Sequence, residues 1–215
     1  MVRRTSFAQE RQPNAVDRFG RWLSTVRMRR FLGDMTGLRA ADIGCGYDAA
    51  LGALLFRSAA SLLLVDVAID PALDAADRTL LCGRLPEVLD DVPSGSVDAI
   101  ICNNVLEHLD EPDATAIHLH RILSPGGVCV VNVPSWRGKR FLELAAFRLG
   151  VAPKEEMDDH RTYYDPRDLW PILVRAGFRP SELKVTRHKG GLNTIARGRK
   201  DRQPDESAEG ASGRQ

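Results

Sequence analysis

Two glycines and two acids near the start of the chain have the types and spacing of a ligand-binding turn. Gly44 and Gly46 follow Asp42 at the end of the apolar run 38–43, and Asp66 stands about 20 residues after Gly46. Glycines at the end of a strand let the backbone bend sharply and approach a ligand closely. A carboxylate at the end of the next strand can accept hydrogen bonds from both ribose hydroxyls. The spacing therefore predicts a nucleoside-binding site.

The residues after Gly46 argue against a dinucleotide. Sites for a pyrophosphate usually carry a third glycine three residues after the second, and here Tyr47, Asp48 and Ala49 follow instead. A carboxylate at Asp48 would also repel a pyrophosphate at the helix N-terminus. We interpret Asp48 either as the cap of the following helix or as a partner for a positively charged group of the ligand.

Strand-like and helix-like segments alternate along the chain and must position these residues. The strand-like runs are continuously apolar rather than alternating, which indicates burial on both faces and a parallel sheet covered by helices. The pattern predicts a doubly wound α/β fold, with strands at residues 38–43, 62–65, 79–82, 97–102 and 128–133 and helices at residues 17–35, 48–56, 113–123 and 165–176, besides a short alanine-containing helix after Pro71.

The two ends of the chain do not follow the alternation of strand-like and helix-like segments. Residues 182–186 and 192–196, joined through Gly190 and Gly191, predict a closing antiparallel pair. Residues 1–14 are polar and predict a loose arm, and residues beyond 197 are rich in charge, glycine and serine. We therefore expect one domain over residues 15–198 and a disordered tail over residues 199–215.

Composition limits the possible partners. The 215 residues are 43% hydrophobic and 27% charged, as expected of a folded soluble domain, and the formal net charge of +1 gives no overall field toward nucleic acid. No apolar run approaches the ~18 residues that cross a bilayer, and the start of the chain lacks a secretory segment. We expect no integral membrane segment and a cytoplasmic location. Oligomeric state stays open.

The four cysteines lie in or beside apolar runs and form no C-x-x-C pair. This favours buried free thiols over disulfides or a zinc site, and no spacing of His, Cys and Asp suggests a metal. The residues concerned are Cys45, Cys82, Cys102 and Cys129.

Several short motifs in this order resemble the class I S-adenosylmethionine (SAM)-dependent methyltransferases, over about residues 35–198. Asp42, Gly44 and Gly46 match the family's first motif, and Asp66 matches its ribose-binding acid. The other matching segments are 96–109, which resembles the fourth strand and V-L-E-H motif of the small-molecule branch (methyltransferase type 11/12-like), 123–127, which resembles the L-x-P-G-G turn, and 175–178, which resembles the A-G-F turn.

The resemblance implies a Rossmann-like, mostly parallel seven-stranded sheet with an antiparallel C-terminal hairpin, and SAM as cofactor. It implies cofactor contacts from Asp42, Gly44, Cys45, Gly46, Asp66, Val67, Arg84, Leu85 and Asn103. One departure concerns the adenine. The family often has an acid after the third strand, and residues 82–85 offer none, so a backbone contact could replace it.

Two histidines are candidates for a catalytic base. His108 follows the fourth strand, and its imidazole could take a proton near neutral pH or simply start a helix. His160 lies among acids and two tyrosines in an insert after the fifth strand, where the family often builds its substrate lid, and could be a base, a substrate ligand or a lid-packing residue. Glu107 is interpreted as a structural acid.

The sequence predicts a methyltransferase that acts on a small-molecule acceptor, with oxygen favoured because Asn103, Asn104 and Val105 stand where nitrogen-directed relatives carry N-P-P-Y. We expect no nucleic-acid partner. Two alternatives stay open: a non-catalytic SAM-binding or scaffold protein, and an RNA methyltransferase that uses the arginine-rich first thirty residues.

Overall fold

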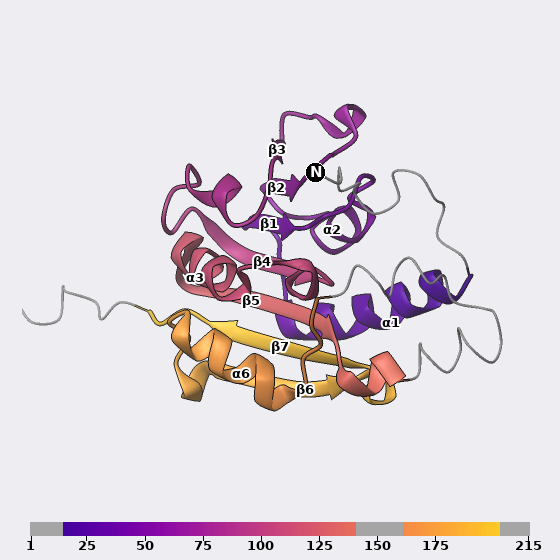
Figure 1. The fold of residues 1–215 in the computed structure, drawn as a ribbon. Coiled ribbons are helices and arrows are strands. Elements are labelled where there is room, and N and C mark those ends of the chain that lie inside the picture. Colours follow the sequence, from indigo (N-terminus) through magenta and orange to yellow (C-terminus); the bar gives the residue numbers. More distant parts are fainter. Residues whose placement is uncertain (1–14, 141–160, 203–215) are drawn as a thin grey trace, which may run out of the picture.

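A computed structural model of the chain describes residues 15–140 and 161–202. It contains a seven-stranded sheet of order β3-β2-β1-β4-β5-β7-β6, which runs from top to bottom in Figure 1. The strands are β1 (Arg39–Ile43), β2 (Ser61–Asp66), β3 (Arg78–Cys82), β4 (Val97–Asn103), β5 (Leu123–Pro134), β6 (Leu183–His188) and β7 (Asn193–Arg199). The predicted Rossmann-like fold is confirmed: β1 to β5 pair in parallel, and β7 pairs antiparallel with β5 and β6.

Helices cover both faces of this sheet. The α-helices labelled in Figure 1 are α1 (Ala15–Leu32), α2 (Ala50–Leu55), α3 (Pro112–Ile122) and α6 (Pro166–Arg175), and residues 136–140 are also helical. Short 3₁₀ turns are η1 (Pro71–Leu73), η2 (Glu87–Leu89), η3 (Leu106–His108), η4 (Pro180–Glu182) and η5 (Lys189–Gly191). None of the described helices is long and apolar enough to cross a bilayer.

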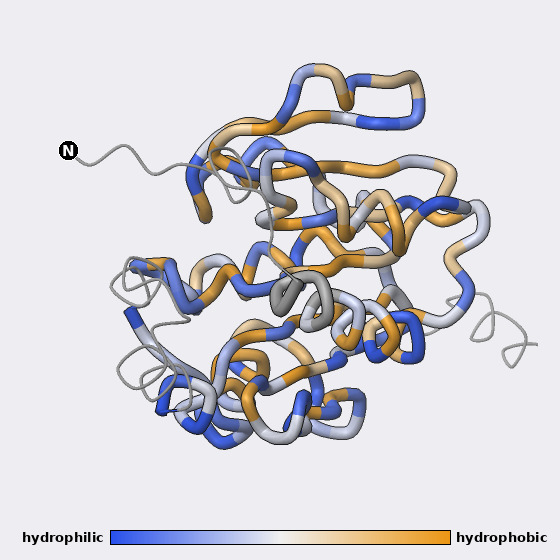
Figure 2. Tube along the Cα trace, turned by 90° about the vertical axis from the view of Figure 1, so that its right-hand side faces the viewer, coloured by the Kyte–Doolittle hydropathy of each residue, from blue (hydrophilic) through white to orange (hydrophobic). Residues whose placement is uncertain are grey.

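The core divides into two clusters, one on each face of the sheet. Met28 and Leu32 of α1 pack with Leu55 of α2 on one face, whereas Leu119 of α3 and Leu169 of α6 pack on the other. Successive residues of β4 point to opposite clusters, and all of residues 99–102 are buried. Apolar segments run through the centre of the fold, as the colouring of Figure 2 shows. Burial on both faces explains why these strands are continuously apolar.

Several details differ from the sequence predictions. The alanine-containing helix after Pro71 is only the 3₁₀ turn η1, whose first free amide, that of Ala72, donates to Asp70 at 2.9 Å. Strand β5 begins at Leu123, before Pro125 and two glycines, because Leu123 pairs with Val97 across a register shift. Cys82 is exposed at the end of the edge strand β3, whereas the other three cysteines are buried free thiols.

The ends of the chain are described only in part. Strand β7 continues to Arg199, and the Lys200 ammonium donates to the carbonyl oxygens of His120, Arg121 and Leu123 at 2.9, 3.2 and 2.7 Å. The predicted arm at residues 1–14 and the tail from residue 203 onward lie outside the described residues, as does His160.

Candidate functional site

The backbone bends sharply directly after β1. Gly44 and Gly46 have φ angles of 73° and 77°, which side-chain-bearing residues rarely adopt. The amides of Gly44 and Cys45 donate to the Val65 carbonyl at 2.7 and 3.1 Å, so the bend is tied to the end of β2. A Cβ atom at Gly44 would overlap the side chain of Val105. The glycine is therefore required both by conformation and by space.

Asp66 faces this bend from the end of β2. Its Oδ2 accepts a hydrogen bond from the Gly46 amide at 2.8 Å, and its Oδ1 accepts one from the Val67 amide at 2.7 Å. The side chain is half-buried. An ionised carboxylate has about four lone-pair sites, so two or so stay available for hydroxyl donors of a ligand. The predicted pairing of bend and acid is present in the structure.

Asp42 lies behind the bend rather than in it. The residue is 1% exposed, and its Oδ2 has no hydrogen-bond partner among the described residues. Burial raises the pKa of Asp42 to about 8, while a backbone hydrogen bond from Gly52 partly opposes this and the nearby Asp66 adds to it. Gly52 of α2 packs so closely that a Cβ there would overlap the Asp42 carboxyl group. Asp42 thus joins β1 to α2, and a direct ligand contact stays a prediction.

The start of α2 departs from the capping prediction. Ala49, with φ of 44°, precedes the helix as its N-cap, and the Asp48 carboxylate accepts from the Ala50 amide at 3.3 Å. Asp48 therefore stands one residue too early to be the N-cap, although it still satisfies one amide of the first turn. Its side chain is exposed beside the bend.

The remaining predicted cofactor residues surround the bend at the carboxyl ends of the strands. Val67 is exposed next to Asp66, and Cys45 is a buried thiol whose pKa burial raises. Arg84 and Leu85 follow β3, beside Asp66, because the intervening Gly83 amide donates to the Asp66 carbonyl at 2.9 Å. The structure therefore brings these segments together around one edge of the sheet.

Asn103 belongs to a cluster of three asparagines at the ends of β4 and β5. The Asn132 Nδ2 donates to the Oδ1 of Asn103 at 2.9 Å and to that of Asn104 at 3.3 Å. Asn104 has a positive φ of 56°, and its amide donates to the Asn132 carbonyl at 2.8 Å. Sequence reasoning missed Asn132, although an asparagine inside the apolar run 128–133 was the available signal; the structure shows it fully buried.

His108 ends η3, beyond the asparagine cluster. The residue is half-buried, and its amide donates to the Val105 carbonyl at 2.9 Å. The adjacent Glu107 is fully buried, and neither of its carboxylate oxygens has a partner among the described residues. Burial raises the pKa of Glu107 to about 8. Arg161 and Thr162 donate their amides to the Glu107 carbonyl at 2.9 and 3.3 Å, so residues 161 and 162 lie beside η3.

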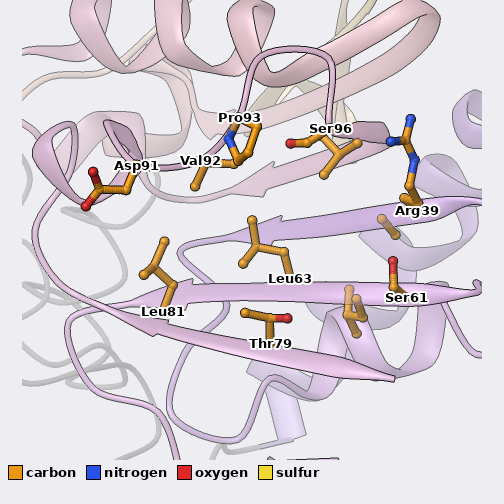
Figure 3. Close-up of a pocket in the computed structure, with 12 residues that line it drawn as sticks. Arg39, Ser61, Leu63, Thr79, Leu81, Asp91, Val92, Pro93 and Ser96 are labelled. Carbon is orange, nitrogen blue, oxygen red and sulfur yellow. The ribbon is translucent and has the colours of Figure 1, made fainter. Parts of the chain in front are cut away.

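The apolar hollow in Figure 3 is a separate feature. It has a volume of about 310 Å³ and lies between the first strands and the segment 91–97. Arg39, Ser61 and Val97, the first residues of β1, β2 and β4, line it. This hollow is therefore at the amino ends of these strands, away from the bend. Only the short η2 stands between β3 and β4, which leaves Leu63 and Leu81 incompletely covered.

Within residues 15–140 and 161–202, no group of three or more His, Cys, Asp or Glu side chains could hold a metal ion. The groups around the bend are hydrogen-bond donors and acceptors: backbone amides, the half-buried Asp66 carboxylate and side-chain amides. This donor set suits a polar ligand with hydroxyl and amino groups.

Comparison with known proteins gives consistent matches. A family model described as a methyltransferase domain matches residues 15–183. A ubiquinone biosynthesis O-methyltransferase of Xanthomonas oryzae pv. oryzae is 34% identical over 173 residues, which cover 74% of this chain and 68% of that protein. Another, of Psychrobacter arcticus, is 25% identical over 161 residues, 69% of this chain and 62% of that protein.

Solved structures match the fold. The structure of magnesium protoporphyrin IX methyltransferase from Synechocystis PCC 6803 with bound SAH superposes with a TM-score of 0.61 and 20% identity, over 89% of this chain and 90% of that one. The chain spans somewhat under two thirds of the Psychrobacter relative and slightly more than two thirds of the Xanthomonas relative.

Proposed function

The chain belongs to the class I methyltransferase family whose domain model matches it, and from this we propose that it transfers a methyl group from SAM to an oxygen atom of a small-molecule acceptor. The observation that carries the proposal is the hydrogen bond of 2.8 Å between the Gly46 amide and the Asp66 carboxylate. It places an acid directly against the bend, where a nucleoside sugar would lie.

The residues at the bend fit SAM. Asp66 would accept the ribose hydroxyls, Val67 and Leu85 would flank the adenine, and the backbone of Gly44 and Gly46 would leave room for the rest of the nucleoside. Cys45, Arg84 and Asn103 complete the proposed contacts, and Asp42 supports the bend from behind. SAM, when bound, supplies a methyl group that is already activated on a sulfonium, so the protein has mainly to position the acceptor.

Oxygen is the proposed acceptor atom because both relatives named above are O-methyltransferases. A hydroxyl nucleophile must lose its proton during transfer, and a histidine is the usual base near neutral pH. We assign this role first to His108, which ends η3 beyond the carboxyl end of β4. His160 stays a second proposed base or substrate ligand. We propose no nucleic-acid partner, since the formal net charge is only +1.

Calorimetric titration of the full chain with S-adenosylhomocysteine (SAH) tests the proposal. Asp66→Ala should weaken SAH binding roughly a hundredfold, because two hydrogen bonds to a charged carboxylate would be lost. Asp74→Ala removes an exposed acid from the turn η1 and should leave SAH affinity unchanged. Failure of the unaltered chain to bind SAH would overturn the proposal. Transfer of labelled methyl from SAM into a metabolite extract would separate an enzyme from a binding protein.

A further inference from the structure

A second hollow opens at the carboxyl end of β5, and cationic side chains dominate its wall. It has a volume of about 670 Å³ and is lined by Trp136, Arg137, Lys139, Arg140, Asp165 and Arg167. Small-molecule sites commonly have volumes of about 300–1,000 Å³. Four of the six lining side chains are positively charged and only one is acidic, although the chain as a whole is almost neutral. The charge is therefore concentrated at this place.

The segment that carries three of these cations is firmly anchored. Ser135 donates its amide to the Leu192 carbonyl at 3.0 Å and its hydroxyl to the Gly191 carbonyl at 2.6 Å. The same hydroxyl accepts from the Gly138 amide at 3.0 Å. Gly138 lies so close to the Leu192 carbonyl that a Cβ atom would overlap it. These contacts hold residues 135–138 against the turn between β6 and β7, which is the condition for a preorganised site.

Trp136, which lines the hollow, packs against a second aromatic ring. The rings of Trp136 and Tyr163 lie with their centroids 5.5 Å apart, and the Lys139 Nζ is 5.5 Å from each centroid. Tyr163 is buried, whereas Trp136 stays 42% exposed. An exposed tryptophan at the mouth of a charged hollow offers a flat apolar surface for the organic part of a ligand.

The positive charges of the hollow lie close together and repel one another, and a bound anion would offset this repulsion. Within the described residues, neither Arg137 nor Arg140 forms an ion pair. Arg167 is the second residue of α6, where the helix dipole disfavours a positive charge, and among the described residues it pairs with Asp168 alone, at 3.8 Å. Its side chain is 84% exposed. The helix terminus and the arginines thus add their positive potentials in one place.

The position of this hollow relates it to the acceptor rather than to the nucleoside. The bend and Asp66 belong to β1 and β2, whereas β4 and then β5 follow on the other side of β1. The strand order changes direction at β1 and β4, and ligands bind beyond the carboxyl ends of the strands at such a point. A cofactor placed over β1 and β2 leaves the ends of β4 and β5 for the acceptor.

We propose that the acceptor carries a phosphate or diphosphate group, which Arg137, Arg140 and Arg167 bind while Trp136 contacts its organic part. This inference deepens the proposed function and rests on it, because it takes the molecule bound in the hollow to be the methyl acceptor. Arginine forks suit phosphate oxygens, and three of them with Lys139 match a group of two or more negative charges better than a single carboxylate. The carboxylate of Asp165 in the wall would repel a nucleic-acid backbone, which favours a small molecule.

Titration of the SAH-saturated full chain with inorganic pyrophosphate measures the site directly. The unaltered chain should bind one equivalent, and the double variant Arg137→Ala/Arg140→Ala should bind at least about thirtyfold more weakly. The matched control Arg30→Ala/Arg57→Ala removes two exposed arginines elsewhere and should bind as the unaltered chain does. Arg167→Gln, on a highly exposed side chain, gives a second variant in case the double variant does not fold.

The outcomes separate this inference from the proposed function. Equal pyrophosphate binding by the double variant and its control, or none by the unaltered chain, overturns the phosphate site even where SAH binds normally. Failure to bind SAH overturns the function, while the same pyrophosphate titration of the full chain without SAH still decides the site. In an assay that follows labelled methyl into a metabolite extract, phosphatase treatment of the extract should abolish methyl transfer. Methyl transfer that persists after this treatment would contradict the inference.

The phase that holds the labelled product then identifies the source of the phosphate. A product in the aqueous phase indicates a phosphorylated metabolite, and one in the organic phase indicates a lipid-linked phosphate. Binding of tRNA that is lost in the same double variant, without pyrophosphate binding, would show a nucleic-acid surface instead and would refute the small-molecule site.

Discussion

The two halves of the carboxyl edge of the sheet are built by different means. On the side of β1 and β2, backbone amides and carbonyls make the site: Gly44, Cys45 and Gly46 all donate to groups at the end of β2. On the side of β5, charged side chains and the Trp136 ring line the proposed site, and they come from two segments, 136–140 and 165–167. The first half is fixed by local conformation, whereas the second exists only after distant segments have packed.

Each half also contains one fully buried acid, and the two differ in their surroundings. Burial is the main cause of the raised pKa at both acids, but at Asp42 a backbone hydrogen bond from Gly52 lowers the pKa and the nearby Asp66 and Asp48 raise it further. Both acids have a pKa of about 8 in the folded chain. On the side of β1 and β2, which we call the nucleoside half, the buried acid is therefore hydrogen-bonded to the backbone of α2. On the β4 side, neither carboxylate oxygen of Glu107 has a hydrogen-bonding partner among the described residues.

The largest loss of stability and of SAH binding is expected at the bend after β1, which is formed by the backbone. Gly44→Ala should destabilise the fold by about 3 kcal/mol or more, because left-handed strain and overlap with Val105 add together. SAH binding should be lost as well. Chemical denaturation measures the first effect and calorimetry the second.

Gly37→Ala is the matched control for this substitution. Gly37 has a φ of 72°, almost the same as Gly44, but a Cβ atom there would meet nothing within 4 Å. It should cost only the conformational strain of about 1 kcal/mol. Equal destabilisation by the two variants would show that packing of the bend against Val105 contributes nothing, and the comparison drawn above would fail.

An intermediate effect is expected from Glu107, and it should depend on pH. The folded pKa of about 8 lies above the ordinary value of 4.5, so between these values the unfolded chain loses a proton that the folded chain keeps. Stability contributed by this group is present below about pH 4.5 and is lost as the pH rises to 8. Glu107→Gln should remove that loss and be more stable than the unaltered chain at pH 8, by a few kcal/mol.

The pH profile distinguishes this effect from simple repacking. The stability difference between Glu107→Gln and the unaltered chain, measured by denaturant unfolding, should grow steadily from pH 4.5 to pH 8. A difference that stays constant over this range would show that the carboxyl group is not protonated in the fold, and the β4 side would then hold no neutral buried acid.

The smallest effect is expected at the opposite end of the sheet. Asp98 accepts from Arg39 and from the Ser124 hydroxyl at 2.8 Å, and the Arg39 hydrogen bond is the main cause that lowers the pKa of Asp98 to about 2. Because the folded pKa is depressed, the stabilisation is present above the ordinary value of 3.8 and is lost as the pH falls toward 2. Asp98→Asn should cost about 1 kcal/mol at pH 7, since the Arg39 side chain is 47% exposed.

This substitution should leave both SAH and pyrophosphate affinities unchanged. Asp98 and Arg39 stand at the start of β4 and β1, beside the apolar hollow and away from the carboxyl ends. Calorimetric titrations of Asp98→Asn with the two probes check this. A change in either affinity would mean that the two ends of the sheet are coupled, against the separation described here.

The nucleoside half could be predicted from sequence because its determinants are local. A buried strand must be continuously apolar, a left-handed bend requires glycine, and the acid of the next strand follows at a nearly fixed spacing. Asp42, Gly44, Gly46 and Asp66 therefore revealed the bend and the acid that faces it, and the alternation of strand-like and helix-like segments indicated the fold class. Helix and strand ends were less well predicted, as at Leu123 and Pro71, since pairing and packing set them.

Only the tertiary structure decided which side chains come together on the β5 side of the carboxyl edge. Nothing in the local sequence states that residues 136–140 lie beside Arg167, that Asn132 bonds the ends of β4, or that Cys82 is exposed at the edge. These depend on contacts between segments about 30 residues apart, such as the bond of 2.9 Å from the Tyr164 amide to the Pro134 carbonyl. Conformational requirements are local and leave a pattern in the sequence, whereas a constellation of side chains is fixed by how the elements pack.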